Sequence, residues 1–346
     1  MKVLVTGGGG FLGRRIVELL LNRGDVDEVR FVARGRYPDV EALGARGISA
    51  DIRRRGEVDT AVAGVDVVIH VAALASFVGS SSTFWATNVE GTRNIIAAAQ
   101  THGVTRLVYT STPSVVGYDT DLENAGPQTP YATTFDSPYP ATKATAERDV
   151  LAANREQLAT VALRPHLIFG PGDRHLMPRV IDRARRGRLR WVGDGRNRVD
   201  LTYIDNAAWA HLDAVDALQR QPEACAGKAY FISNSEPVVI LHWLNDVLRR
   251  LGIPPVNKTV SLRTARIAGS VLTALWKILP LSGEPTMTPF LAKALARSHW
   301  YDMGPAQRDL NYWVRVPMQE GTARMVAWLQ STALCEGNRE VPAKAE

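Results

Sequence analysis

The sequence predicts an α/β fold, in which a doubly wound parallel sheet is followed by a smaller C-terminal lobe. In the first half, short apolar runs alternate with segments of helical periodicity. A glycine cluster directly follows the first apolar run, and from about residue 163 paired Pro and Gly residues divide the chain into shorter pieces. Strands that alternate with helices are joined by right-handed crossovers, so their sheet is parallel and covered on both faces.

The elements of the first half follow a regular order. We expect strands at 3–5, 29–32, 65–70 and 106–110, and helices at 12–22 and 88–101. The runs assigned to strands are short and rich in valine, whereas the helical segments are longer and amphipathic. Sheets of this kind bind their ligands at the carboxyl ends of the strands. Residues that follow the predicted strands are therefore the first candidates for a functional site.

The composition is that of a globular protein with its own core. The 346 residues are 45% hydrophobic and 22% charged, and 41 Lys and Arg against 35 Asp and Glu give a net charge of +6. That excess favours small anionic ligands and does not require nucleic acid. Cys225 and Cys335 lack metal-ligand spacing, and residues 1–5 form no secretion signal. We therefore expect a cytoplasmic protein without a bound metal.

The glycine cluster predicts a dinucleotide site. It reads Thr6-Gly7-Gly8-Gly9-Gly10-Phe11-Leu12-Gly13, which places Gly7, Gly10 and Gly13 directly after the first strand and at the opening of the first helix. A chain that turns tightly against a pyrophosphate has no room for Cβ atoms, and the N–H groups that open the helix face the anion. We expect cofactor contacts from these glycines and from Phe11 and Leu12.

The end of the second strand predicts which dinucleotide binds. A carboxylate there binds the ribose of NAD, whereas arginine accommodates the 2′-phosphate of NADP. The segment reads Val32-Ala33-Arg34-Gly35-Arg36, so we expect NADP(H) to be held by Arg34 and Arg36. The alternative is that both arginines are solvent-facing loop residues. Asp51 and Ile52, which follow the next apolar stretch, are candidates for contact with the adenine edge.

A tyrosine and a lysine at helical spacing predict acid–base chemistry. In Tyr139-Pro140-Ala141-Thr142-Lys143 the two side chains lie four residues apart, and therefore on one face of a helix. The pKa of tyrosine is ordinarily about 10, and a nearby ammonium lowers it by favouring the phenolate. The strand at 106–110 ends in hydroxyl residues, and a hydroxyl there can hydrogen-bond a substrate carbonyl.

With these motifs in this order, the chain resembles the extended short-chain dehydrogenase/reductases over about residues 1–330. Three more segments match that family: His70-Val71-Ala72-Ala73, Asn88-Val89-Glu90-Gly91-Thr92 and Arg164-Pro165-His166-Leu167-Ile168-Phe169-Gly170-Pro171. The resemblance implies that Ala72 and Ala73 line the cofactor and that Asn88 supports the active-site helix. It further implies that Pro165 and Leu167 meet the nicotinamide side and that Tyr139 and Lys143 contact the cofactor.

One position departs from the family pattern. Counting back from Gly117, the family's catalytic serine falls on Thr112. A threonine hydroxyl can donate the same hydrogen bond, so we expect Thr112 to take this role. Ser111 and Ser114 are the alternatives.

The branch of the family indicates the substrate. Residues 109–117, 139–143 and 200–206 are similar to relatives of 3β-hydroxysteroid dehydrogenases, and among these to bacterial 2-alkyl-3-oxoalkanoate reductases of long-chain olefin biosynthesis. This similarity implies NADPH-dependent reduction of a hydrophobic β-keto acid to the hydroxy acid. The alternatives are a 3β-hydroxysteroid or sterol-4-carboxylate 3-dehydrogenase, a nucleotide-sugar enzyme, and an NADP-sensing regulator without catalysis. A sensor has no need of the tyrosine and lysine, which this chain keeps.

The expected domain division places a Rossmann domain at 1–164, rejoined by 197–232, a mainly substrate-binding lobe at 165–334 and a disordered tail at 335–346. The apolar segment 262–281 carries Arg263, Arg266 and Lys277, too many charges for a membrane span. We expect it to be an amphipathic helix that covers the substrate, contacts a partner enzyme or lies on a membrane surface. We also expect a homodimer that acts on a lipid-like small molecule.

Overall fold

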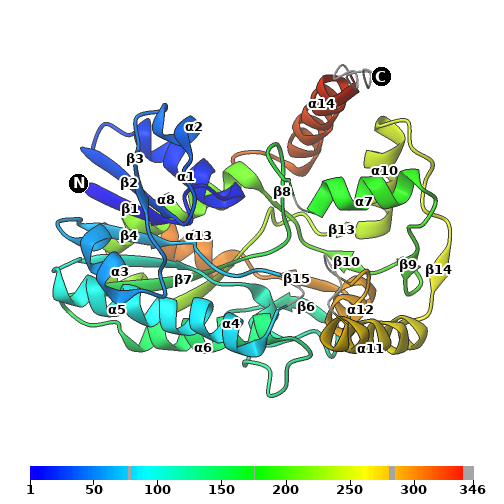
Figure 1. Ribbon diagram of the computed structural model, residues 1–346, viewed down its shortest axis with the longest axis horizontal. Coiled ribbons are helices and arrows are strands. Elements are labelled where there is room, and N and C mark those ends of the chain that lie inside the picture. Colours follow the sequence, from blue (N-terminus) through cyan, green and yellow to red (C-terminus); the bar gives the residue numbers. More distant parts are fainter. Residues whose placement is uncertain (77–78, 175, 280–284, 338–346) are drawn as a thin grey trace, which may run out of the picture.

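The computed structural model describes residues 1–76, 79–174, 176–279 and 285–337 (Figure 1). Its main sheet has seven strands in the order β12-β7-β5-β4-β1-β2-β3, and every neighbouring pair is parallel. The predicted doubly wound sheet is therefore confirmed. The strands are β1 (Lys2–Thr6), β2 (Glu28–Ala33), β3 (Arg46–Ser49), β4 (Val67–His70), β5 (Arg106–Thr110), β7 (Ala159–Pro165) and β12 (Lys228–Ile232).

Helices cover both faces of this sheet (Figure 1). One face carries α1 (Phe11–Leu21), α8 (Ile204–Arg220) and α13 (Gly304–Leu310), and the other carries α3 (Arg55–Val62), α5 (Gly91–Thr101) and α6 (Pro138–Ala152). The central strand β1 is buried on both sides, since Val3 and Val5 belong to one core and Leu4 to the other. Burial on both faces explains why its apolar run is continuous rather than alternating.

The second lobe lies beyond the carboxyl ends of the main strands (Figure 1). It holds a four-stranded sheet in the order β13-β10-β15-β6 and two strand pairs, β8 with β11 and β9 with β14. Its strands are β6 (Leu122–Ala125), β8 (Ile168–Phe169), β9 (Trp191–Val192), β10 (Arg198–Val199), β11 (Thr202–Tyr203), β13 (Val238–Val239), β14 (Thr259–Val260) and β15 (His299–Tyr301). Its helices are α7 (Leu176–Arg185), α10 (Ile240–Arg250), α11 (Leu262–Ile278), α12 (Pro289–Ala296) and α14 (Met318–Gly337). The two lobes interleave in sequence, because β6 precedes β7 while α8 and β12 return to the main sheet.

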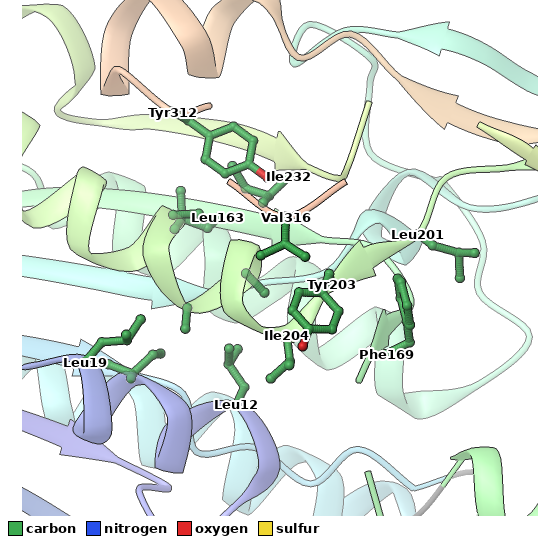
Figure 2. Packing of buried hydrophobic residues seen from close by; sticks show 14 of the residues in the cluster. Leu12, Leu19, Leu163, Phe169, Leu201, Tyr203, Ile204, Ile232, Tyr312 and Val316 are labelled. Atoms are coloured by element: carbon green, nitrogen blue, oxygen red, sulfur yellow. The ribbon is translucent and has the colours of Figure 1, made fainter. Parts of the chain in front are cut away.

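One apolar cluster runs from the main sheet into this lobe. Leu12 and Leu19 of α1 lie near Ile204 of α8, and Phe169 and Tyr203 continue the same cluster (Figure 2). The Phe169 ring lies 5.6 Å from the Tyr203 ring, centroid to centroid. Because close-packed cores resist deformation, this shared core holds the lobe in one position over the carboxyl edge of the sheet.

The observed boundaries differ from the sequence-based ones at several places. The sequence does not predict β3, because this edge strand has Ile48 as its one large apolar residue and shows no apolar run. The helix expected at 88–101 begins as a π-helical turn at Trp85–Glu90. The helix expected at 262–281 ends at Ile278, and 280–281 lie outside the described residues. Helix α14 continues to Gly337, so 335–337 are helical rather than part of a tail, and 338–346 lie outside the described residues.

Candidate active site

The glycine turn links β1 to α1 at the carboxyl edge of the main sheet. Gly7 has a φ of +72°, a conformation that favours glycine. A Cβ on Gly13 would lie 2.2 Å from the carbonyl oxygen of Gly7, so the turn closes only around glycine. Gly10 is the N-cap of α1 and has no side chain to cap the N–H groups that open the helix at Phe11 and Leu12. The turn therefore fits the pyrophosphate of a dinucleotide.

The loop after β2 lies beside this turn and carries the arginines expected to select the cofactor. Arg34 and Arg36 are both exposed in it. Tyr37 follows them, and its ring carbons would lie 2.4 Å from a Cβ on Gly9. The ring is therefore packed directly on the glycine turn, which explains why a glycine also stands at position 9. No motif in the sequence pointed to Tyr37.

The structure gives Asp51 and Ile52 other partners than an adenine. The Nε of Arg53 lies 2.9 Å from both carboxylate oxygens of Asp51, and this contact holds the pKa of Asp51 below its ordinary value. Ile52 is buried, and its carbonyl accepts a hydrogen bond from Asn94 Nδ2 on α5 at 2.9 Å. The Ile52 side chain thus belongs to the core, and the Asp51 carboxylate would have to exchange Arg53 for a base.

A buried histidine orders the segment after β4. The Nδ1 of His70 lies 2.7 Å from Thr6 Oγ1, which also accepts the backbone N–H of Ala72 at 3.1 Å. On the other side, His70 Nε2 lies 3.0 Å from Thr92 Oγ1, which in turn donates to a backbone carbonyl. Burial lowers the pKa of His70 to about 3, so the ring is neutral at physiological pH. The network holds Ala72 and Ala73, both partly exposed, beside the glycine turn.

Asn88 connects this segment to the helix that carries the tyrosine and lysine. It lies in the π-helical turn that precedes α5 and is buried. Its Oδ1 accepts the backbone N–H of Leu74 at 2.7 Å, and its Nδ2 donates to Thr142 Oγ1 on α6 at 3.1 Å. The Asn88 amide therefore connects α6 to the segment that follows β4.

The structure brings Tyr139 and Thr112 together. Tyr139 lies in the first turn of α6, and Thr112 follows β5 as the N-cap of the short helix Pro113–Val116. Burial raises the pKa of Tyr139 to about 12, while a side-chain hydrogen bond with Thr112 acts in the opposite direction. Ser114 Oγ lies 3.0 Å from Thr112 Oγ1, and Ser111 Oγ is buried with no hydrogen-bond partner among the described residues. Of the three candidate hydroxyls, Thr112 is the one that influences the pKa of Tyr139.

The surroundings of Lys143 differ from the sequence-based expectation. Lys143 is buried, and its Nζ donates to the carbonyl oxygen of Thr110 at 2.5 Å and lies 4.0 Å from the centre of the Tyr109 ring. Burial lowers the pKa of Lys143 to about 7. The expectation of a lowered tyrosine pKa is therefore wrong for this structure. Desolvation has the largest effect on the pKa of Tyr139, and desolvation also disfavours the protonated form of Lys143.

The structure also contains a buried ion pair near Lys143 that no motif in the sequence predicts. Glu147 lies one turn beyond Lys143 on α6, and its carboxylate accepts Arg164 Nη2 at 2.6 Å and Nε at 3.0 Å. Tyr131 also donates to Glu147, at 2.6 Å. Arg164 comes from the end of β7, so the pair fastens α6 to that strand. The negative charge of Glu147 also raises the pKa of Lys143 and so opposes part of the effect of burial.

The segment 165–167 begins at the last residue of β7 and lies at the carboxyl edge of the main sheet. Pro165 and His166 are buried, whereas Leu167 is 37% exposed and has a φ of +35°. The Nε2 of His299 lies 2.8 Å from a carbonyl oxygen and so carries a proton, which makes its Nδ1 the acceptor for His166 Nε2 at 2.7 Å. Two neutral histidines thus connect β7 to β15 of the second lobe. Leu167 is held with a strained backbone between them and β8.

With this geometry in view, the sequence profile of the 3-beta hydroxysteroid dehydrogenase/isomerase family matches residues 4–263 of the chain. The chain belongs to this family. The curated relatives of the chain are named as reductases and dehydrogenases, and the predicted enzyme class, an oxidoreductase, is confirmed.

Several curated members of the family are similar over almost the whole chain. The 2-alkyl-3-oxoalkanoate reductase of Stenotrophomonas maltophilia is 50% identical over 329 residues, which cover 94% of this chain and 99% of that protein. The enzyme of the same name from Shewanella oneidensis is 44% identical and covers 94% and 85%. The mouse sterol-4-alpha-carboxylate 3-dehydrogenase is 32% identical and covers 94% and 90%.

Solved structures show the same fold. The dTDP-glucose 4,6-dehydratase DesIV of Streptomyces venezuelae, whose structure contains NAD, superimposes with a TM-score of 0.74 at 25% identity and covers 97% of this chain and 98% of its own. The UDP-glucuronic acid 4-epimerase of Bacillus cereus, also solved with NAD, gives 0.73 at 20% identity and covers 96% and 99%. These structural similarities show that the chain has the fold of the extended short-chain dehydrogenase/reductases.

Proposed function

We propose that this oxidoreductase reduces the 3-oxo group of a hydrophobic 2-alkyl-3-oxo acid to a hydroxyl, with NADPH as the reductant. The observation that carries the proposal is the placement of Tyr139 at the start of α6 and of Thr112 directly after β5, on the sheet edge that also carries a glycine turn fit for a dinucleotide. The Thr112 side chain also acts to lower the pKa of Tyr139. The 50% identity to a 2-alkyl-3-oxoalkanoate reductase, over nearly the full length of both chains, supports the choice of substrate.

In the proposed reaction, Tyr139 is the proton donor. A phenol with a pKa of about 12 keeps its proton at neutral pH, as an acid in a reduction must. Bound NADPH supplies the hydride that the carbonyl carbon accepts. Thr112 donates a hydrogen bond to the carbonyl oxygen and stabilises the charge that develops there. Lys143, when protonated, stabilises the phenolate that Tyr139 becomes.

The choice of substrate is tested by parallel assays. We expect kcat/KM with NADPH and a 2-alkyl-3-oxo acid to exceed, by tenfold or more, the value for a 3-oxosteroid. The hydroxy acid and a 3β-hydroxysteroid with NADP⁺ provide the reverse reaction as a control. If the steroid is the better substrate in both directions, the proposed substrate is wrong while the family and reaction type stand.

The two arginines after β2 are proposed to select NADPH over NADH. Arg34 and Arg36 are exposed beside the glycine turn, where charge-assisted hydrogen bonds to a 2′-phosphate contribute about 1–3 kcal/mol. Replacing both by serine should weaken NADPH binding by roughly tenfold or more and leave NADH binding nearly unchanged. The measurement is titration of each cofactor.

A matched control is Arg46→Ser, which removes an exposed arginine at the amino end of β3, on the opposite edge of the sheet. It should leave both affinities unchanged. Equal affinity of the intact protein for NADPH and NADH would contradict the proposed preference.

A further inference from the structure

Helix α11 exposes an apolar stripe at the surface of the second lobe. Ile267, Val271, Leu275 and Ile278 recur at intervals of four, four and three residues, which places them along one side of the helix. Their exposed fractions are 59%, 55%, 40% and 78%. Single exposed apolar residues are common on proteins, but four in a row on one helix mark a surface that binds something.

The charges around the stripe indicate what it binds. Arg263 and Arg266 are exposed on the same helix, and residues 262–279 contain no Asp or Glu. An apolar stripe flanked by cations is typical of helices that lie in the interface of a membrane with anionic lipids. Among the described residues, no helix has the length and apolar content to cross a bilayer. The charge and the exposure therefore favour a helix that lies on a membrane surface.

The opposite side of α11 leads toward the candidate active site. A Cβ on Gly269 would lie 2.7 Å from the backbone of Thr288, so α11 packs closely on the start of α12. Two residues on, the Phe290 ring lies 5.8 Å from the buried ring of Tyr118, which in turn lies 6.4 Å from the ring of His166 in the segment 165–167 of the candidate active site. Figure 1 shows α11 and α12 side by side at the outer edge of the lobe. The helix pair thus spans from the exposed stripe to the aromatic side chains beside the segment 165–167.

We propose that α11 docks the enzyme on the surface of a bilayer that contains anionic phospholipids. The stripe enters the upper part of the acyl chains, while Arg263 and Arg266 meet the headgroup phosphates. Docking in this orientation brings α12, and behind it the side of the candidate site formed by the segment 165–167, toward the lipid, from which an alkyl-chain substrate can enter. The docking itself is independent of the proposed substrate.

The test is vesicle co-sedimentation of the full-length protein. We expect the protein to sediment with phosphatidylcholine vesicles that contain phosphatidylglycerol and to bind phosphatidylcholine alone at least tenfold more weakly. Val271→Ser combined with Ile278→Ser should reduce binding to the anionic vesicles by tenfold or more. Arg263→Gln combined with Arg266→Gln should remove most of the preference for phosphatidylglycerol, as should high salt.

Leu43→Ser is the matched control, because Leu43 is also exposed, at 47%, but lies near the start of β3 and far from α11 in the chain. It should bind vesicles like the unmodified protein. All variants should keep their thermal unfolding midpoint and their kcat with a short, water-soluble oxo acid, since none of these residues lies in the candidate active site. An unmodified protein that sediments with neither vesicle overturns the proposal. It is also overturned if the Val271→Ser and Ile278→Ser protein changes from dimer to monomer with no change in vesicle binding, because the stripe would then join two copies of the chain.

Discussion

Replacing Tyr139 with phenylalanine should lower kcat by about 10²–10⁴-fold, the usual contribution of one general acid. The substitution removes only the hydroxyl, so packing in the first turn of α6 is kept. The proton that the reduced carbonyl oxygen needs must then come from water. Cofactor affinity should stay nearly constant, which separates loss of chemistry from loss of binding. The measurement is steady-state kcat with NADPH and a 2-alkyl-3-oxo acid, together with NADPH titration.

Variants of the three neighbouring hydroxyls provide the controls. Thr112→Ser keeps the hydroxyl and should retain most of the activity, whereas Thr112→Val should lose about 10²–10³-fold, the typical cost of one donor to a developing oxyanion. Ser111→Ala and Ser114→Ala should lose less, because of the three hydroxyls only that of Thr112 influences the pKa of Tyr139. A Tyr139→Phe enzyme that turns over at the unmodified rate would exclude Tyr139 as the donor. Full activity in Thr112→Val would transfer the hydroxyl role to one of the serines.

Replacing Glu147 with glutamine should destabilise the protein by about 3–5 kcal/mol, the usual cost of breaking a buried ion pair by removing one partner. Arg164 is 2% exposed and would be left with a buried, unpaired charge. The measurement is the free energy of unfolding from urea titration. Asp182→Asn is the matched control, since its ion pair with Arg186 is exposed and should contribute about 1 kcal/mol or less.

The Glu147→Gln substitution should also change how kcat/KM depends on pH. The carboxylate of Glu147 raises the pKa of Lys143, while burial lowers it to about 7. Without the carboxylate this pKa falls further, so less Lys143 is protonated at neutral pH. We expect the alkaline limb of the profile of kcat/KM against pH to move to lower pH. In the double variant Glu147→Leu, Arg164→Met the unpaired charge is gone, so stability should recover while the shift of the profile remains. A Glu147→Gln protein as stable as the unmodified one would show that the pair does not support the fold.

Much of the candidate site is predictable because its signals are local. The predicted boundaries of β1, α1, β2, β4 and β5 agree with the structure to within two residues, since each element is a continuous apolar or amphipathic run. The glycine turn requires residues that are adjacent in sequence, and Tyr139 and Lys143 require only the periodicity of one helix. These features can be recognised in the sequence because they do not depend on how distant parts of the chain fold.

Other features depend on which elements become neighbours in space. Glu147 and Arg164 are 17 residues apart on α6 and β7, and His166 and His299 are 133 residues apart, so no spacing rule connects them. Tyr37 is found only by its packing on Gly9. Edge strand β3 has too few apolar residues to be recognised, because half of its surface never enters the core.

The sequence by itself therefore determined the parallel sheet, the glycine turn, the order of the candidate site residues and the family. The tertiary structure alone decided the protonation of these residues. Tyr139 has a raised pKa and Lys143 a lowered one, because the strands and helices around them exclude water, and desolvation penalises whichever form carries charge. Burial of this kind is a property of the assembled fold, to which residues distant in the sequence contribute, and it is absent from any local pattern.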